Sequence, residues 1–195
     1  MITNGYATIQ QVKDALRVTD AIDDSLIELS IEAASREIDA YCQRVFYSTT
    51  ATRTYTPDSS FLCSIDDLVS LTSLKTSTNT SWDTTWGASD YQLEPTNGIS
   101  GGLTQPYNRI RAVNLFTFPV LTVPEVTVQV TGVFGWSAVP MDVRIACILQ
   151  AQRLFKRFDS PLGVIGMGDL GSIRVSRVDS DVQALLAPYV KVSFA

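Results

Sequence analysis

Neighbouring acidic residues are the groups in this chain most able to do chemistry. Three pairs occur along the sequence: Asp23/Asp24, Asp66/Asp67 and Asp179/Asp181. Carboxylates bind a cation or act as acid and base only when their oxygens converge on one point or stand at a defined separation. Sequence neighbours on a helix or strand point apart. The first and third pairs also stand where helices are expected to begin, which favours capping over metal binding.

A glycine-rich segment, Gly166–Gly171, has the spacing G-x-G-x-x-G of dinucleotide-binding loops. In those loops a strand precedes the glycines, and a helix whose N-terminus holds the pyrophosphate follows them. Here a helical pattern precedes the glycines and strand-like Ile173–Val175 follows them. The reversed context favours a flexible loop over a cofactor site.

The chain contains no histidine. This excludes Ser-His-Asp and Cys-His nucleophiles as well as histidine-ligated zinc. The three cysteines, Cys42, Cys63 and Cys147, are far apart and form no Cys-x-x-Cys pair, so we expect reduced thiols in a cytosolic setting. A carboxylate or Ser-Lys scheme remains, but the few lysines lie in solvent-facing or terminal settings. The sequence therefore predicts no enzyme, metal or cofactor.

Aromatic residues are frequent in the middle of the chain, where they could stack on a sugar or on single-stranded nucleic acid. Such a site needs flanking basic residues, and few are present. Packing inside the fold is therefore the favoured interpretation. The aromatic residues are Trp82, Trp86, Tyr91 and Tyr107, and the basic ones are Lys75, Arg109 and Arg111.

Composition places the chain among globular proteins. Of its 195 residues, 45% are apolar and 18% charged, with a net charge of −5. This length suits one domain, or one domain that carries a large insertion. The negative charge disfavours general DNA binding. We expect no membrane span or export signal, because no segment approaches the roughly 20 apolar residues of a span.

The first region has a helical pattern. Thr8 and Gln11 match a capping box, in which each side chain bonds the backbone of the other residue. A longer amphipathic helix is predicted from about Asp23 to Arg44, because apolar residues recur there at alternating steps of three and four. These apolar residues are Ile27, Ile31, Ala34, Ile38, Tyr41 and Val45.

The second region, Phe46–Trp136, is rich in Thr, Ser, Val and aromatic residues, which favours short strands. A hairpin is expected from Leu71–Thr76 and Asp83–Trp86, with further strands at Asp90–Leu93 and Arg109–Asn114. The clearest two-residue period places Val126, Val128 and Val130 on a buried face and Thr127, Gln129 and Thr131 on a polar one.

The third region returns to a helical pattern. Pro140 suits a first helical position, and one face is expected to carry Ile145, Ile148, Leu149, Gln152, Phe155 and Phe158. Basic residues in its last turns, Arg153, Lys156 and Arg157, complement the helix dipole more readily than they bind phosphate. A short helix is predicted from near Asp179 to Pro188.

These patterns predict an α+β protein. Residues 1–46 and 137–195 form a helical bundle, with N-terminal helices and a long C-terminal helix, and a β-rich insertion over 47–136 interrupts it. Residues 189–195 form an apolar tail, which is expected either to fray or to dock on a partner.

In order along the chain, these segments resemble the head-to-tail connector (adaptor) proteins of long-tailed bacteriophages, prophages and gene transfer agents, in the longer branch with a β insertion. The order and spacing of the segments carry the resemblance, since each one alone is a packing pattern. The matching segments are Tyr6–Val18, Asp23–Ile27, Ile31–Cys42, Ser73–Thr76, Asp90–Leu93, Val130–Trp136, Val139–Ala146 and Leu185–Tyr189.

The resemblance implies a structural virion protein, made in the host cytoplasm and located in the neck between capsid and tail. About twelve copies would form a ring below the portal protein, extend the DNA channel without specific DNA binding, and dock the stopper or a tail-completion protein. It further implies portal contacts by the C-terminal segment through Leu186, Tyr189, Val190 and Phe194. The loop residues Leu162, Val164, Ile165 and Met167 are expected to contact neighbouring subunits.

An alternative remains within the same virion. A tail-completion or tail-terminator protein would also be acidic, lack a catalytic set and contain β-rich contacts. The helical opening and closing segments favour the connector.

Overall fold

A computed structural model describes residues 2–79, 81–121, 125–159, 164–165, 173–174 and 179–191. The chain divides into two compact units, which we call the helical unit (Met1–Arg44 with Val139–Ala195) and the sheet unit (Val45–Ala138). Helices and an antiparallel sheet are both present, so the predicted α+β class is confirmed.

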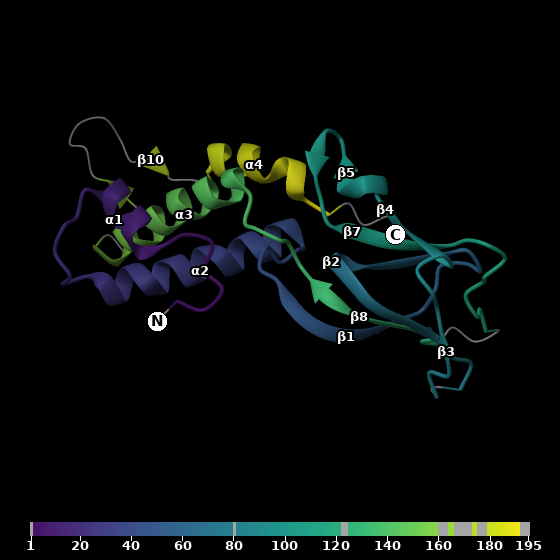
Figure 1. Cartoon of the computed structure of the whole chain (residues 1–195). Helices are drawn as coiled ribbons and strands as arrows, with labels where there is room; N and C mark the ends of the chain where they lie inside the picture. Colours follow the sequence, from purple (N-terminus) through teal and green to yellow (C-terminus); the bar gives the residue numbers. More distant parts are fainter. Residues whose placement is uncertain are drawn as a thin grey trace. The chain divides into compact units, whose positions relative to one another are not determined.

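The helical unit is built from packed helices (Figure 1). Helix α2 packs along α3, and α1 and α4 both contact α3. The unit also contains a two-stranded sheet, β9–β10, and a short 3-10 helix, η2. The bounds are α1 Ile9–Leu16, α2 Asp24–Cys42, α3 Met141–Asp159, β9 Val164–Ile165, β10 Ile173–Arg174, α4 Ser180–Leu186 and η2 Ala187–Tyr189.

A capping box stabilises the start of α1, and an ion pair joins α1 to α2. The predicted capping box is confirmed, since the Thr8 side chain accepts from the Gln11 N–H and the Gln11 side chain accepts from the Thr8 N–H. Lys13, although largely buried, reaches Asp24 at the start of α2, with 2.7 Å between Nζ and Oδ1. This ion pair ties the two helices together.

The predicted apolar face of α2 is confirmed over most of its length, from Ile27 to Ile38. It is wrong at the C-terminal end, where Tyr41 is exposed and Cys42 is buried instead. An α-helix has 3.6 residues per turn, whereas alternating steps of three and four average 3.5 residues. Over a helix of this length the difference moves the buried stripe by one position relative to the predicted one.

The predicted face of α3 is wrong. Ile145 is 40% exposed and Phe158 is 55% exposed. The buried positions are Val143, Ala146, Cys147, Gln150 and Ala151. Small side chains let neighbouring helices approach closely, and the Ser35 hydroxyl oxygen of α2 lies 3.5 Å from the Cys147 sulfur. Close helix packing, not side-chain hydrophobicity, selects the buried face here.

The sheet unit contains a six-stranded antiparallel sheet (Figure 1). The strand order is β1-β8-β2-β7-β4, and β3 pairs with β2. A separate two-stranded sheet, β5–β6, follows the 3-10 helix η1. The bounds are β1 Thr49–Tyr55, β2 Leu62–Thr76, β3 Thr84–Thr85, β4 Tyr91–Glu94, η1 Thr96–Gly98, β5 Ile99–Ser100, β6 Leu103–Thr104, β7 Tyr107–Ala112 and β8 Val128–Phe134.

The predicted hairpin is confirmed, because Thr76 pairs with Thr84 and Lys75 with Thr85. The predicted β8 alternation holds from Val128 onward but is wrong before it. Val126 is exposed, and Thr127 is buried with its hydroxyl donating to the Pro119 carbonyl at 2.7 Å. A buried hydrogen-bond acceptor lets a threonine take an inward position.

Candidate interaction surfaces

The C-terminal segment packs on the helical unit. Leu186 and Tyr189 are buried, and Val190 is half-buried. The Tyr189 hydroxyl donates to Asp142 Oδ2 at 3.1 Å, and the Lys191 N–H donates to the Cys42 carbonyl at 2.9 Å. Burial, together with the Asp142 carboxylate, raises the pKa of Tyr189. The chain is thus held as far as Lys191.

The other predicted contact residues either lie outside the described residues or form β9. Phe194 lies outside the described residues. The same is true of Leu162 and Met167 in the predicted subunit-interface loop and of the glycine motif Gly166–Gly171. Val164 and Ile165 form β9, which pairs with β10 in antiparallel register. The portal and subunit contacts of these residues stay predictions.

The acidic pairs act structurally. Asp179 caps α4 by accepting from the Asp181 N–H at 3.0 Å, and it also pairs with Arg153 at 3.0 Å. Asp23 precedes α2, but its side chain makes no capping bond, so this capping prediction is wrong in detail. Its neighbour Asp24 is held by Lys13 instead, as described above.

The two carboxylates of the strand pair Asp66/Asp67 accept hydrogen bonds from different residues. Asp66 Oδ2 accepts from Arg53 at 2.7 Å, while Asp67 Oδ2 accepts from the Trp136 indole N–H at 3.1 Å. Among the described residues, no group of three or more His, Cys, Asp or Glu side chains is placed to hold a metal ion.

Three of the four aromatic residues singled out in the sequence pack in or against the core of the sheet unit. Trp86 is buried, stacks on Phe118 with 4.7 Å between ring centroids, and donates from its indole N–H to Thr76 Oγ1 at 2.9 Å. Tyr91 and Tyr107 pack partly buried against the same core. The packing interpretation is confirmed for these three residues.

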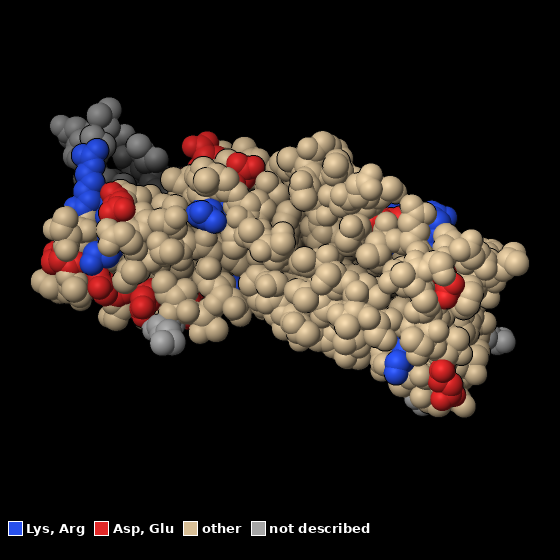
Figure 2. All heavy atoms as spheres, in the orientation of Figure 1, with Lys and Arg blue, Asp and Glu red and all other residues tan. Residues whose placement is uncertain are grey.

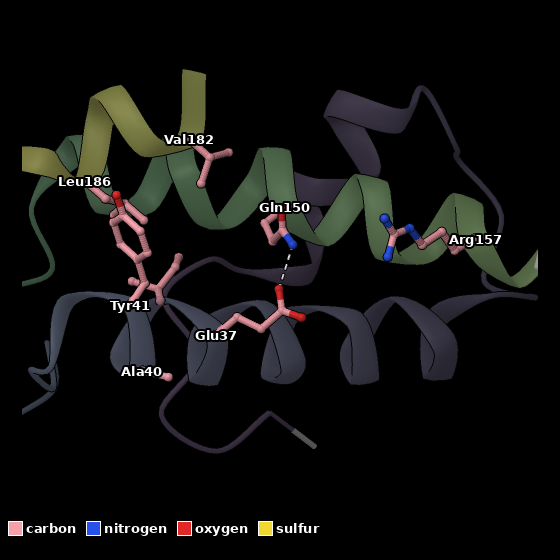
Figure 3. Close-up of a pocket in the computed structure, with 8 residues that line it drawn as sticks. Glu37, Ala40, Tyr41, Gln150, Arg157, Val182 and Leu186 are labelled. Atoms are coloured by element: carbon pink, nitrogen blue, oxygen red, sulfur yellow. Dashed lines mark hydrogen bonds between the residues drawn. The ribbon is translucent and has the colours of Figure 1, made fainter. Parts of the chain in front are cut away.

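A groove of about 370 Å³ lies between α2, α3 and α4 (Figure 3). Ile38, Val182 and Leu186 supply apolar surface, and Arg157 lines the groove as well. Gln150 donates from Nε2 to Glu37 Oε2 at 2.6 Å. We call this the α2–α3–α4 groove.

Gln150 is a buried polar residue beside the groove. The side chain is only 7% exposed, and its Oε1 atom has no hydrogen-bond partner within the part of the chain that the structure describes. The bond to Glu37 requires the amide nitrogen to face the carboxylate, so turning the amide round would not satisfy the oxygen. The groove therefore presents mainly apolar surface, and the Gln150 oxygen is a buried atom rather than an exposed acceptor. Nothing in the sequence pattern singled out Gln150.

An exposed turn at the end of β7 is the second surface that sequence reasoning missed. The Phe116 N–H donates to the Val113 carbonyl at 3.0 Å, and the central residues Asn114 and Leu115 have φ of 52° and 67°. Leu115 is 100% exposed. An apolar side chain in the left-handed region, fully in water, is uncommon. We call Val113–Phe116 the Leu115 turn.

Charge is distributed without a basic stripe on the face that Figure 2 shows. Acidic and basic side chains are interspersed over the helical unit, and charged side chains are sparse over the visible face of the sheet unit. No helix among the described residues has the length and apolar character needed to cross a bilayer.

The comparisons with known proteins point to one family. Residues 6–84 match the model of the phage gp6-like head-tail connector protein. A comparison with curated proteins gave no match.

Solved structures share the fold. "Neck of empty GTA particle computed with C6 symmetry" aligns with a TM-score of 0.61 at 17% identity, covering 100% of this chain and 94% of that chain. "Virion of native gene transfer agent (GTA) particle" aligns at 0.59 and 18%, with coverage of 100% and 94%. "Neck of native GTA particle computed with C12 symmetry" aligns at 0.55 and 19%, with coverage of 96% and 90%.

Proposed function

We propose, from the premise that residues 6–84 are a phage gp6-like head-tail connector domain, that this chain is an adaptor of the virion neck, where it joins the capsid to the tail. The family match is the observation that carries the proposal. The fold shared with chains from neck and virion structures supports it, since the alignments extend over nearly the whole chain. The protein would be made in the host cytoplasm and then built into the particle.

The adaptor acts as a ring of about twelve copies below the portal protein. Two of the similar structures are necks computed with C6 and C12 symmetry, which supports a rotational assembly. In a cyclic ring, one surface of each copy contacts a different surface of the next copy until the ring closes. The predicted loop residues Leu162, Val164, Ile165 and Met167 belong to this subunit contact.

The role is structural and needs no enzymatic activity or cofactor. The ring extends the DNA channel and offers a docking surface to the stopper or a tail-completion protein. With a net charge of −5, the chain suits a lumen through which DNA slides, because phosphate contacts would hold the DNA in place.

The C-terminal segment contacts the portal. We assign different roles to its residues on the basis of their burial. Leu186 and Tyr189 are buried and hold the segment on the helical unit. We assign the portal contact to Val190 and Phe194. Val190 is half-buried, and Phe194 follows the residues that are held on the helical unit. Repetition around the ring makes a weak contact per copy sufficient.

Native mass spectrometry of the purified chain mixed with its cognate portal ring tests this function. A truncation after Lys191 removes Phe194 but keeps the Tyr189 and Lys191 contacts, so the helical unit stays folded. We expect the full chain to bind with the copy number of the portal and the truncated chain to bind much more weakly.

The thermal unfolding midpoint of the truncated chain is the control, because it should equal that of the full chain. If the full chain fails to bind the portal, the portal contact is wrong. Binding to tail components in its place would identify the alternative, a tail-completion or tail-terminator protein. If the truncated chain binds as tightly as the full chain, the assignment of Phe194 is wrong.

A further inference from the structure

The outer side of α3 carries an apolar stripe that the fold leaves partly in water. Met141, Ile145, Ile148 and Phe155 recur at steps of four, three and seven residues, which places them on one side of the helix. Met141 is 63% exposed and Ile145 is 40% exposed, while Ile148 and Phe155 are half-buried. We call these four residues the α3 stripe.

Helix α3 is therefore apolar on two opposite sides. Its inner side, with Val143, Ala146 and Cys147, is buried inside the helical unit, where α3 packs along α2. A helix at the surface of a globular protein has one apolar side, whereas a helix that is apolar on both sides is normally enclosed in a larger body. The uncovered α3 stripe thus points to a partner that packs against it.

Helix α2 offers a matching surface on the side away from α3. Its inner side contacts α3, since Ser35 Oγ lies 3.5 Å from the Cys147 sulfur. Leu29, Ala33 and Ala40 recur at steps of four and seven residues and are all exposed, Leu29 to 58%. Figure 3 shows Ala40 on the side of α2 that is turned away from α3. We call these three residues the α2 stripe, and its two small alanines leave room for larger side chains of another helix.

The two helices also carry opposite charge. The segment that forms α2 has five carboxylates and one arginine, whereas the segment that forms α3 has four basic and two acidic residues. Beside the α3 stripe, the side chains of Arg144 and Lys156 form no ion pair with the described residues. Beside the α2 stripe, Glu37 is exposed. Opposite charges along two apolar stripes favour pairing of the stripes and disfavour pairing of either one with itself.

We propose that the α3 stripe of one copy packs on the α2 stripe of the next copy, with Arg144 and Lys156 near the carboxylates of that α2. The occupant is a second copy because the two complementary stripes lie on opposite sides of the α2–α3 pair in one helical unit, so every copy presents both. Two different surfaces pair head to tail, and such a contact closes into a ring when the rotation allows it. The inference rests on the proposed ring and names its contact.

Disulfide cross-linking between two single variants tests this contact. Ala33→Cys is placed in the α2 stripe of one batch of chain, and Ile145→Cys in the α3 stripe of another. The native cysteines are all buried and free, so they do not compete. We expect the mixture to form covalent dimers, both on the portal ring and in concentrated protein alone.

The matched control pairs Ala33→Cys with Ala184→Cys, an exposed alanine of α4 that belongs to neither stripe. We expect several-fold fewer dimers from the control mixture. Equal yields from the two mixtures, or no dimers in either setting, would overturn the contact. If Ala33→Cys alone dimerised as readily as the mixture, the copies would pair in a two-fold manner, and the head-to-tail contact would be wrong.

A second set of variants distinguishes this contact from a folding role. Met141→Asp places a carboxylate in the first turn of α3, where it is favourable for the helix, so we expect no fall in the unfolding midpoint. It also brings a negative charge against the acidic α2 of the next copy, so we expect fewer copies bound per portal than for the unmodified chain. Ala184→Asp makes the same change of charge on α4 and should retain the full copy number.

The outcomes separate the contact from the adaptor function. Full occupancy of the portal by the Met141→Asp variant would refute the inference while leaving the adaptor function intact. Failure of the unmodified chain to bind the portal would refute the portal contact alone, because cross-linking in concentrated protein still tests the contact between copies.

Discussion

At the scale of single residues, burial decides the chemistry of the cysteines. All three thiols are free and buried, Cys42 and Cys147 in the helical unit and Cys63 in the sheet core. Burial raises the pKa of Cys42 to about 11 and that of Cys63 to about 12, and it also raises the pKa of Cys147. Because the thiolate is the reactive form, these side chains are inert at neutral pH.

The folded chain should therefore resist thiol reagents at pH 8 and react at three sites after denaturation. The Leu115→Cys variant is the control, since its exposed thiol should react at once. Mass spectrometry of the alkylated protein measures both. Rapid labelling of any native cysteine in the folded chain would contradict the buried placement.

The same pKa shifts set a dependence of stability on pH. The unfolded thiol has a pKa near 9.0, and the folded value for Cys42 is about 11. Below pH 9 both states are protonated and the stability is fully present, whereas above it the unfolded state loses protons first. We expect the urea midpoint to fall as the pH rises from 9 to 11. A Cys42→Ala variant should fall less steeply, and an equal slope would argue against this cause.

At the scale of elements, the end of β8 depends on a close approach of two backbone segments. Gly135 has a φ of 100°, and a Cβ atom there would lie 1.9 Å from the Tyr47 carbonyl oxygen. Its N–H donates to the Asp67 carbonyl at 2.7 Å. No side chain fits at this position, so the glycine holds the start of β1 and the end of β8 in register.

Gly135→Ala should therefore destabilise the sheet unit by more than about 2 kcal/mol. Gly101 provides the comparison, because its φ of 59° is also positive but nothing lies within 4 Å of its added Cβ. Gly101→Ala should cost only about 1 kcal/mol. Thermal unfolding of both variants measures the difference, and equal losses would show that φ alone matters.

The sequence patterns predicted where helices and strands form more accurately than which face of each is buried. The Thr8 and Gln11 cap and the Thr76–Thr84 hairpin follow from local chemistry, so both could be predicted. The buried face of α3 could not, because Ala146 and Cys147 are selected by how closely α2 approaches. Periodicity reports hydrophobic content and is insensitive to the space available between helices.

The candidate interaction surfaces were the least predictable part. Gln150 and Leu115 belong to no motif. Each becomes notable only through its environment, a buried acceptor with no partner among the described residues in one case and a fully exposed apolar side chain in the other. The C-terminal segment could be predicted as apolar, but the burial of Leu186 and Tyr189 depends on α3 and α4 packing.

At the scale of the whole molecule, the net charge sets the response to DNA that we expect. The chain carries 15 basic and 20 acidic residues, and the visible face shows no basic stripe. In the proposed ring, a net charge of −5 per copy would repel the phosphate backbone of DNA. This repulsion would keep a DNA duplex away from the wall of the proposed channel.

We expect no retardation of double-stranded DNA by this protein in gel electrophoresis, even at about 50 mM salt, where phosphate contacts are strongest. A basic DNA-binding protein of similar size serves as the positive control. Retardation that weakens steeply with added salt would reveal a local phosphate-binding surface and contradict a non-adhesive channel.

The two ends of the sheet unit meet at one place. Thr49 near its beginning and Phe134 near its end are direct partners in the β1–β8 ladder, so their Cα atoms are only about 5 Å apart. When the two ends of a segment lie close together, the segment can be deleted and its ends joined by a short linker. We expect residues 45–138 to be replaceable by a short linker from Arg44 to Val139, because the order and direction of the remaining helices would not change.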